Sequence, residues 1–119
     1  MKTKALVMIF ILILIGVIVF SSVKSRAPGE YDDFAQCLND AELKMYGTEW
    51  CPHCKAQKKL FGNSFKNIDY IDCDRNRDIC LLEGITGYPT WKITGESVSG
   101  TQPLESLADL ANCELTKDE

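Results

Sequence analysis

The first pattern along the chain is a long apolar segment near its N-terminus. From Ala5 to Val23 no residue is charged, and the 19 positions are apolar apart from one glycine and two serines. A helix of this length would measure about 28 Å, close to the hydrocarbon thickness of a bilayer. Because no A-x-A-like cleavage site follows, we predict that residues 1–26 form an uncleaved signal anchor with its flanks. A cleaved signal peptide is the alternative.

After a linker predicted over 24–30, residues 27–119 show the periodicities of one small α/β domain. The predicted elements are a helix from residue 32, a strand over 43–46, a helix over 51–61, a strand over 67–72, a short helix over 76–83, a hairpin over 90–99 and a helix from Pro103. In the helix over 51–61 or slightly beyond, the spacing makes Ala56, Leu60, Phe61 and Phe65 available for the core and Lys55, Lys58 and Lys59 for solvent.

The domain is acidic. Four of the 13 basic residues flank the apolar segment, so residues 27–119 hold 9 basic and all 17 acidic side chains. This balance argues against nucleic acid as a partner, and the length excludes a dehydrogenase, a kinase or a large hydrolase. Six cysteines beside a secretion-type N-terminus indicate an oxidising compartment. We therefore predict a single-pass membrane protein with its domain on the extracytoplasmic side.

The motif Cys51-Pro52-His53-Cys54 follows a predicted strand and opens a predicted helix. A thiol at a helix N-terminus meets unpaired N–H groups and the positive end of the dipole, which favour the thiolate. We predict that Cys51 is the nucleophile and Cys54 the resolving thiol, with His53 stabilising the Cys51 thiolate. The alternatives are an inert disulfide between the two cysteines and an ordinary surface position for His53.

A zinc site is the other chemistry that paired cysteines can serve. Cys73 and Cys80 are too far apart to form the second close pair that such a site needs. No metal and no cofactor are therefore expected.

Two motifs carry a resemblance to a known family. Glu49-Trp50-Cys51-Pro52-His53-Cys54 and, 35 residues after Cys54, the Pro89 of Gly87-Tyr88-Pro89-Thr90 resemble the thioredoxin superfamily. The resemblance implies a thioredoxin fold, a central mixed sheet flanked by helices, with Pro89 cis beside the cysteine pair. The family's buried Asp, six residues before the first cysteine, is replaced by Met45, which counts against a thioredoxin-style reductase role.

More narrowly, residues 31–113 resemble the thioredoxin-like domain of vitamin K epoxide reductase homologues. The resemblance rests on Phe34-Ala35-Gln36-Cys37-Leu38, Met45-Tyr46-Gly47, the Cys51–Cys54 motif and the segment from Gly87 to Trp91. It implies that the domain passes disulfides to exported proteins and is reoxidised by a quinone-coupled membrane partner. Since no reductase part is present in this sequence, we expect that partner to be a separate protein.

A cis bond before Pro89 would let the backbone of Tyr88 face the cysteines and pair with an extended substrate. Trp50, Tyr88 and Thr90 are therefore expected to bind substrate. Together with Tyr46 and Trp91, Trp50 and Tyr88 would form an apolar rim suited to unfolded clients, and ordinary packing is the alternative for each of the four.

The remaining cysteines form an even set that allows three pairings. Cys73 ends a strand and Cys80 lies in the next helix, while Cys37 and Cys113 lie near the two ends of the domain. We favour Cys73–Cys80 and Cys37–Cys113 as structural disulfides. The alternatives are buried free thiols, or a second redox pair at Cys73–Cys80.

The function expected from the sequence is a membrane-anchored thiol–disulfide oxidoreductase that donates disulfides to client proteins through Cys51 and Cys54. A reductase or isomerase would use the same chemistry in another direction. A non-catalytic thioredoxin-like adaptor is the alternative from a different class, and the intact cysteine pair argues against it.

Overall fold

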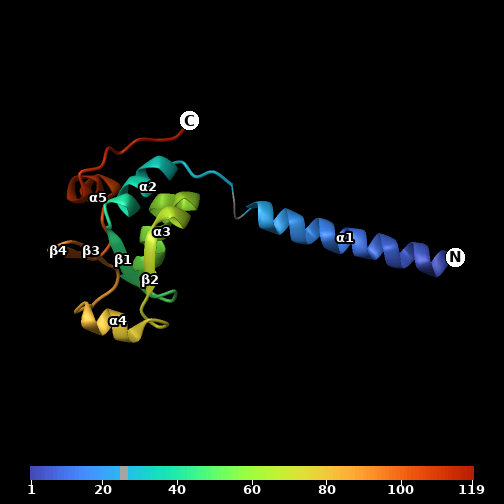
Figure 1. Ribbon diagram of the computed structural model, residues 1–119, viewed down its shortest axis with the longest axis horizontal. Coiled ribbons are helices and arrows are strands. Elements are labelled where there is room, and N and C mark those ends of the chain that lie inside the picture. The colour runs from blue at the N-terminus through green and yellow to red at the C-terminus, as the bar shows by residue number, and fades with distance from the viewer. Residues whose placement is uncertain (25–26) are drawn as a thin grey trace.

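The computed structural model describes residues 1–24 and 27–119, and Figure 1 shows a long N-terminal helix beside a small α/β domain. Helix α1 (Lys2–Lys24) contains a 19-residue stretch, Lys2–Phe20, that is apolar enough to cross a membrane and is not buried. A signal sequence would have the same properties. The predicted linker and domain boundary include residues 25–26, which lie outside the described residues.

A four-stranded mixed sheet forms the centre of the domain, in the order β2–β1–β3–β4. Strands β1 (Lys44–Gly47) and β2 (Asp69–Asp72) are parallel, whereas β3 (Thr90–Ile93) is antiparallel to both β1 and β4 (Glu96–Ser99). The β1–β2 connection contains helix α3 (Pro52–Phe61) and the 3₁₀ helix η1 (Gly62–Asn67). Since η1 takes up Asn67, β2 begins two residues later than the sequence predicts.

The core lies on one face of the sheet. Met45 on β1 pairs with Trp91 on β3, and both side chains are fully buried. They join apolar side chains from α3, from α2 (Asp32–Asp40) and from α5 (Leu104–Ala111) in one cluster. Among the described residues, the opposite face is covered at one end, where α4 (Arg77–Leu82) packs near Tyr46.

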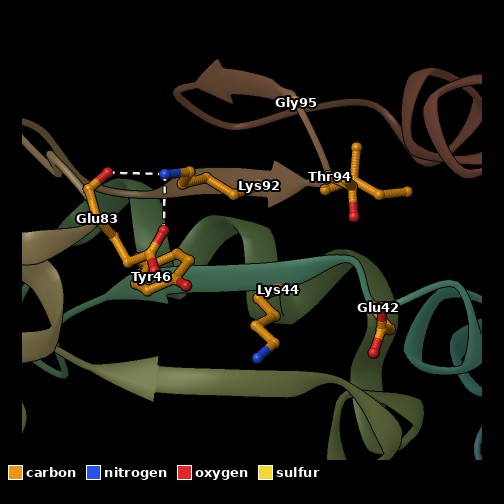
Figure 2. Close-up of a pocket in the computed structure, with 8 residues that line it drawn as sticks. Glu42, Lys44, Tyr46, Glu83, Lys92, Thr94 and Gly95 are labelled. Atoms are coloured by element: carbon orange, nitrogen blue, oxygen red, sulfur yellow. Dashed lines mark hydrogen bonds and ion pairs between the residues drawn. The ribbon is translucent and has the colours of Figure 1, made fainter.

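The rest of that opposite face is polar and open. Figure 2 shows a shallow pocket there, with Lys44 and Tyr46 from β1 and Lys92 from β3 along its floor. The Lys92 ammonium group donates to both the backbone oxygen and the carboxylate of Glu83, each at 2.8 Å. Because this face is charged rather than apolar, it needs no helix to cover it.

The predicted inward face of α3 is partly wrong. Ala56 and Leu60 are exposed, and Gln57 is fully buried. Gln57 Oε1 accepts hydrogen bonds from Trp91 Nε1 at 3.1 Å and from the Gln102 N–H at 2.7 Å, while its Nε2 donates to the Gln102 carbonyl at 3.0 Å. The buried indole N–H of Trp91 needs an acceptor, which is why a polar side chain takes a core position.

The N-terminal and C-terminal segments of the domain contact each other through an ion pair and a backbone hydrogen bond. The Lys117 ammonium group pairs with the Glu30 carboxylate at 2.6 Å, and the Asp118 N–H donates to the Glu30 carbonyl at 2.8 Å. On the other side, Tyr31 N–H donates to Ser64 Oγ in η1 at 2.8 Å. Both ends therefore lie near the C-terminal end of α3, which η1 directly follows.

Candidate active site

Cys51 and Cys54 lie together at the N-terminus of α3 and are both free thiols. Cys51 is the N-cap residue, and its Sγ accepts a hydrogen bond from the Cys54 N–H at 3.4 Å. Pro52 occupies the first turn, where no backbone donor is needed. The local sequence thus aims a free helix-terminal N–H at the Cys51 sulfur, which favours its thiolate.

The two sulfurs differ in their surroundings. Cys51 is 5% exposed and Cys54 is completely buried. Burial raises the pKa of the Cys54 thiol to about 11. Cys54 packs against β1 at Gly47, where a Cβ atom would lie only 2.7 Å from the Cys54 Sγ. Glycine is therefore required at position 47. Because its pKa is raised, Cys54 is a protonated thiol at neutral pH.

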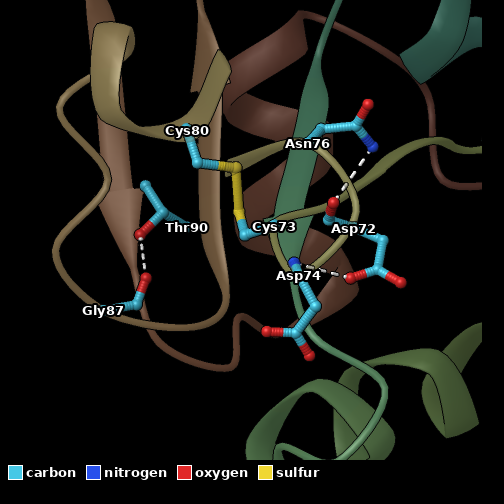
Figure 3. Close-up of a disulfide and its surroundings, with 7 residues drawn as sticks. All are labelled: Asp72, Cys73, Asp74, Asn76, Cys80, Gly87 and Thr90. Carbon is cyan, nitrogen blue, oxygen red and sulfur yellow. Dashed lines mark hydrogen bonds between the residues drawn. A yellow bond between two sulfur atoms is a disulfide. The ribbon is translucent and has the colours of Figure 1, made fainter. Parts of the chain in front are cut away.

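The segment before β3 lies against the first cysteine. The Tyr88–Pro89 peptide bond is cis, and the Cys51 thiol is 3.7 Å from the Tyr88 carbonyl oxygen, to which it donates. Thr90 is buried, and its hydroxyl donates to the Gly87 carbonyl at 2.8 Å (Figure 3). The Thr90 side chain thus holds the segment in shape and points away from solvent.

The predicted apolar rim is only half present. Trp50 is 62% exposed and meets the partly buried Tyr88 edge to face, with 6.2 Å between the ring centroids. Its indole N–H donates to an Asp74 carboxylate oxygen at 2.9 Å. Tyr46 and Trp91 are buried, so their assignment to the rim is wrong. They lie on opposite faces of the sheet, and each is covered by a separate cluster.

His53 lies on the surface beside the pair. Its backbone carbonyl accepts a hydrogen bond from Thr101 Oγ1 at 3.1 Å. In residues 1–24 and 27–119, its imidazole makes no hydrogen bond, so His53 does not stabilise Cys51 through a direct bond. An effect of the imidazolium charge on Cys51 stays a prediction.

The other four cysteines form two disulfides, Cys37–Cys113 and Cys73–Cys80, the pairings that the sequence favours. Figure 3 shows the second disulfide, which joins the segment after β2 to α4. It lies next to β1, because the Cys73 N–H donates to the Gly47 carbonyl at 2.8 Å. Within the part of the chain that the structure describes, no three His, Cys, Asp or Glu side chains form a group that could hold a metal ion.

Sequence reasoning missed a charged group near Cys54. Lys58 was expected in solvent, but its side chain is only 23% exposed. Its ammonium group pairs with the Glu49 carboxylate at 2.8 Å and lies 4.1 Å from the centroid of the Tyr70 ring. The available signal was the spacing, because Lys58 follows Cys54 by four residues and so shares its helix face.

With this geometry in place, comparison with known proteins gives a family. The family profile described as Thioredoxin matches residues 23–112. The chain belongs to the thioredoxin family. The thioredoxin fold predicted from the sequence is thereby confirmed.

Two relatives of known name share this thioredoxin region. Thiol-disulfide oxidoreductase LTO1 of Arabidopsis thaliana is 34% identical over 90 residues, which cover 68% of this chain and 24% of that protein. Protein disulfide-isomerase 1 of Dictyostelium discoideum is 31% identical over 100 residues, covering 76% of this chain and 28% of that protein. The chain thus spans about a quarter of the length of these relatives.

A solved structure agrees on the fold. A mutant thioredoxin from Halobacterium salinarum NRC-1 superposes with a TM-score of 0.51 at 24% identity, covering 63% of this chain and 80% of that one. Met45, which stands where the family resemblance places a buried Asp, is itself fully buried.

Proposed function

We propose that this chain is a thiol–disulfide oxidoreductase whose reacting atoms are the sulfurs of Cys51 and Cys54. The observation that carries the proposal is the unequal pair at the start of α3. Cys51 keeps 5% of its surface exposed and its sulfur accepts a helix N–H, whereas Cys54, one turn deeper, is fully buried. The family and the names of its relatives support the same chemistry.

The exchange proceeds in two displacements. The Cys51 thiolate attacks one sulfur of a client disulfide, and the other client sulfur leaves as a thiolate. Cys54 then loses its proton and attacks the Cys51 sulfur, which closes the Cys51–Cys54 disulfide and releases the first client sulfur as a thiolate. Two electrons pass to the client, whose two thiolates take up protons. The reverse sequence oxidises a client dithiol.

The client is expected to lie across the exposed part of the site. Trp50 and Tyr88 offer an aromatic surface next to Cys51, and the backbone of Tyr88, whose carbonyl oxygen lies 3.7 Å from the Cys51 sulfur, is the segment expected to pair with an extended client. Pro89 and Thr90 are buried beneath it. Client proteins with thiols or disulfides are therefore the substrates that we propose. A separate quinone-coupled membrane partner stays a prediction from sequence resemblance.

We propose disulfide donation as the physiological direction, with His53 contributing through its charge. The full chain in detergent, equilibrated with glutathione buffers, should show a Cys51–Cys54 potential well above the value of about −270 mV typical of thioredoxin. His53→Ala should lower it by roughly 30 mV, equivalent to about 1.4 kcal/mol. Lys59→Ala removes a charge from the exposed side of the same helix and should leave the potential unchanged.

A measured potential near or below that of thioredoxin would contradict disulfide donation and favour the reductase alternative. An isomerase is the second candidate, supported by relatives that are named protein disulfide-isomerases. An isomerase would show a Cys51–Cys54 potential between that of a reductase and that of a disulfide donor, and it would rearrange scrambled disulfides in a client.

We further propose that α1 spans a membrane and anchors the domain on the extracytoplasmic side of that membrane. The support is the length and apolar character of Lys2–Phe20. After expression in cells with an exported-protein pathway, the chain should stay in the membrane fraction through alkaline carbonate washing. Recovery of a soluble chain that begins near residue 25 or 27 would show instead that the segment is a cleaved signal.

A further inference from the structure

A small cluster of polar groups lies on one side of the buried Cys54 thiol, which otherwise packs in the hydrophobic core. Gly47 brings the Cys54 sulfur and the edge of the Tyr70 ring to the same point, since a Cβ there would lie 2.7 Å from the sulfur and 3.4 Å from Tyr70 Cε2. Lys58 lies over the face of that ring, 4.1 Å from its centroid, and one helical turn after Cys54. The Cys54 sulfur and the Lys58 ammonium group therefore lie by the same tyrosine ring, and the Lys58 charge acts to lower the pKa of Cys54.

The ammonium group is held in this place from several sides. Its partner Glu49 is bonded at 2.8 Å, and its second aromatic neighbour is Phe65, with the ring centroid at 5.4 Å. An ammonium group over aromatic faces is stabilised by the ring quadrupoles. The Lys58 bond lowers the pKa of Glu49, so the carboxylate stays ionised and the pair persists at neutral pH.

The same cluster contains a buried hydroxyl. The Tyr70 hydroxyl oxygen is buried, and this burial together with the nearby Glu49 carboxylate raises the pKa of Tyr70. Tyr70 therefore stays neutral and adds no competing negative charge beside the sulfur. The titratable neighbours of Cys54 are Cys51 on α3, Lys58 one turn further and Tyr70 on β2, with Glu49, Asp72 and Arg75 beyond them.

We propose that Lys58 is a positioning residue for Cys54. The Lys58 ammonium group stabilises the Cys54 thiolate whenever that sulfur attacks a disulfide or leaves one. This inference rests on the proposed function. When the protein reduces a client, Cys54 gives up its proton and its thiolate displaces the client sulfur from Cys51. When the protein oxidises a client, the same thiolate is the leaving group. The cation therefore acts at the same atom in both directions.

The test separates the two displacements in time. The reduced full chain in detergent is mixed with Ellman's reagent, 5,5′-dithiobis(2-nitrobenzoate), in a stopped-flow instrument. Attack by Cys51 releases one thionitrobenzoate ion and leaves the second bound to Cys51 as a mixed disulfide. Attack by Cys54 then releases the second ion. Both phases are read by absorbance as a function of pH.

Lys58→Met should slow the second phase about tenfold at pH 7, the change in thiolate fraction that one unit in the pKa of Cys54 produces. The first phase should be unchanged, and the pH at which the second phase levels off should rise. Lys58→Arg keeps the charge and should retain the second phase. Lys59→Met removes the same charge from the exposed side of α3 and should leave both phases intact.

An unchanged second phase in Lys58→Met would overturn the proposal, as would equal slowing in Lys59→Met or equal slowing of both phases. If Lys58→Met does not fold, Lys58→Gln is measured in its place. Absence of any second phase in the wild-type chain would contradict the proposed function itself, which is a different result from a normal second phase that does not depend on Lys58.

Discussion

Replacement of Cys54 by serine is expected to trap client proteins on Cys51 as mixed disulfides, while replacement of Cys51 abolishes exchange. The reason is the order of the two displacements, since Cys51 is 5% exposed and meets the client first, whereas the fully buried Cys54 acts afterwards to release it. At pH 7 a thiol with a pKa of about 11 is ionised in about one molecule in 10⁴. Non-reducing gels of membranes that express each variant provide the measurement.

Alkylation of the reduced protein gives an independent check on this assignment. At neutral pH iodoacetamide should modify Cys51 well before Cys54, as read by peptide mass analysis after short reaction times. The double variant Cys51→Ser/Cys54→Ser is the control for the structural cysteines, and it should trap no client protein as a mixed disulfide. Modification of Cys54 first would show that the roles of the two cysteines are reversed.

Removal of the Cys37–Cys113 disulfide is expected to cost about 4–5 kcal/mol of unfolding free energy on the chain-entropy account. The bond joins residues 76 apart, so it closes most of the domain into one loop. Cys37→Ser/Cys113→Ser should lower the urea midpoint of the full chain in detergent accordingly.

The second disulfide is the matched control for this effect. Cys73–Cys80 joins residues only 7 apart, and the same relation gives about 2.5 kcal/mol for its removal. The long loop should thus cost nearly twice as much as the short one. A larger loss from Cys73→Ser/Cys80→Ser would show that local packing behind the active site, and not loop length, dominates.

The order of the domain's α-helices and strands could be predicted because these elements follow from local patterns, whereas the 3₁₀ helix η1 was not predicted. Apolar residues recur at helical spacing in α2 and α5, and a proline precedes α5. The cysteine motif is likewise local, since a helix N-terminus and two thiols three residues apart define its chemistry. These features need no knowledge of what the rest of the chain contributes.

The errors arise where a distant residue decides. Gln57 is buried because the Trp91 indole, 34 residues away, needs an acceptor. The Lys58 side chain is only 23% exposed because its ammonium group lies over the Tyr70 ring and pairs with Glu49. Helical periodicity identifies a face of α3, but only the tertiary partners determine whether a polar side chain on that face is buried.

The meeting of the domain's two ends has a consequence for how this fold can be rearranged. Glu30 contacts both Lys117 and Asp118, so a short covalent bridge could join the ends without altering the path of the chain through the core. A circularly permuted domain with new ends in a surface loop would keep both disulfides, and insertion into a loop of a host protein would be tolerated for the same reason. Because the junction lies by η1, about 15 Å along α3 from Cys51, the redox pair would still face outward from any such host.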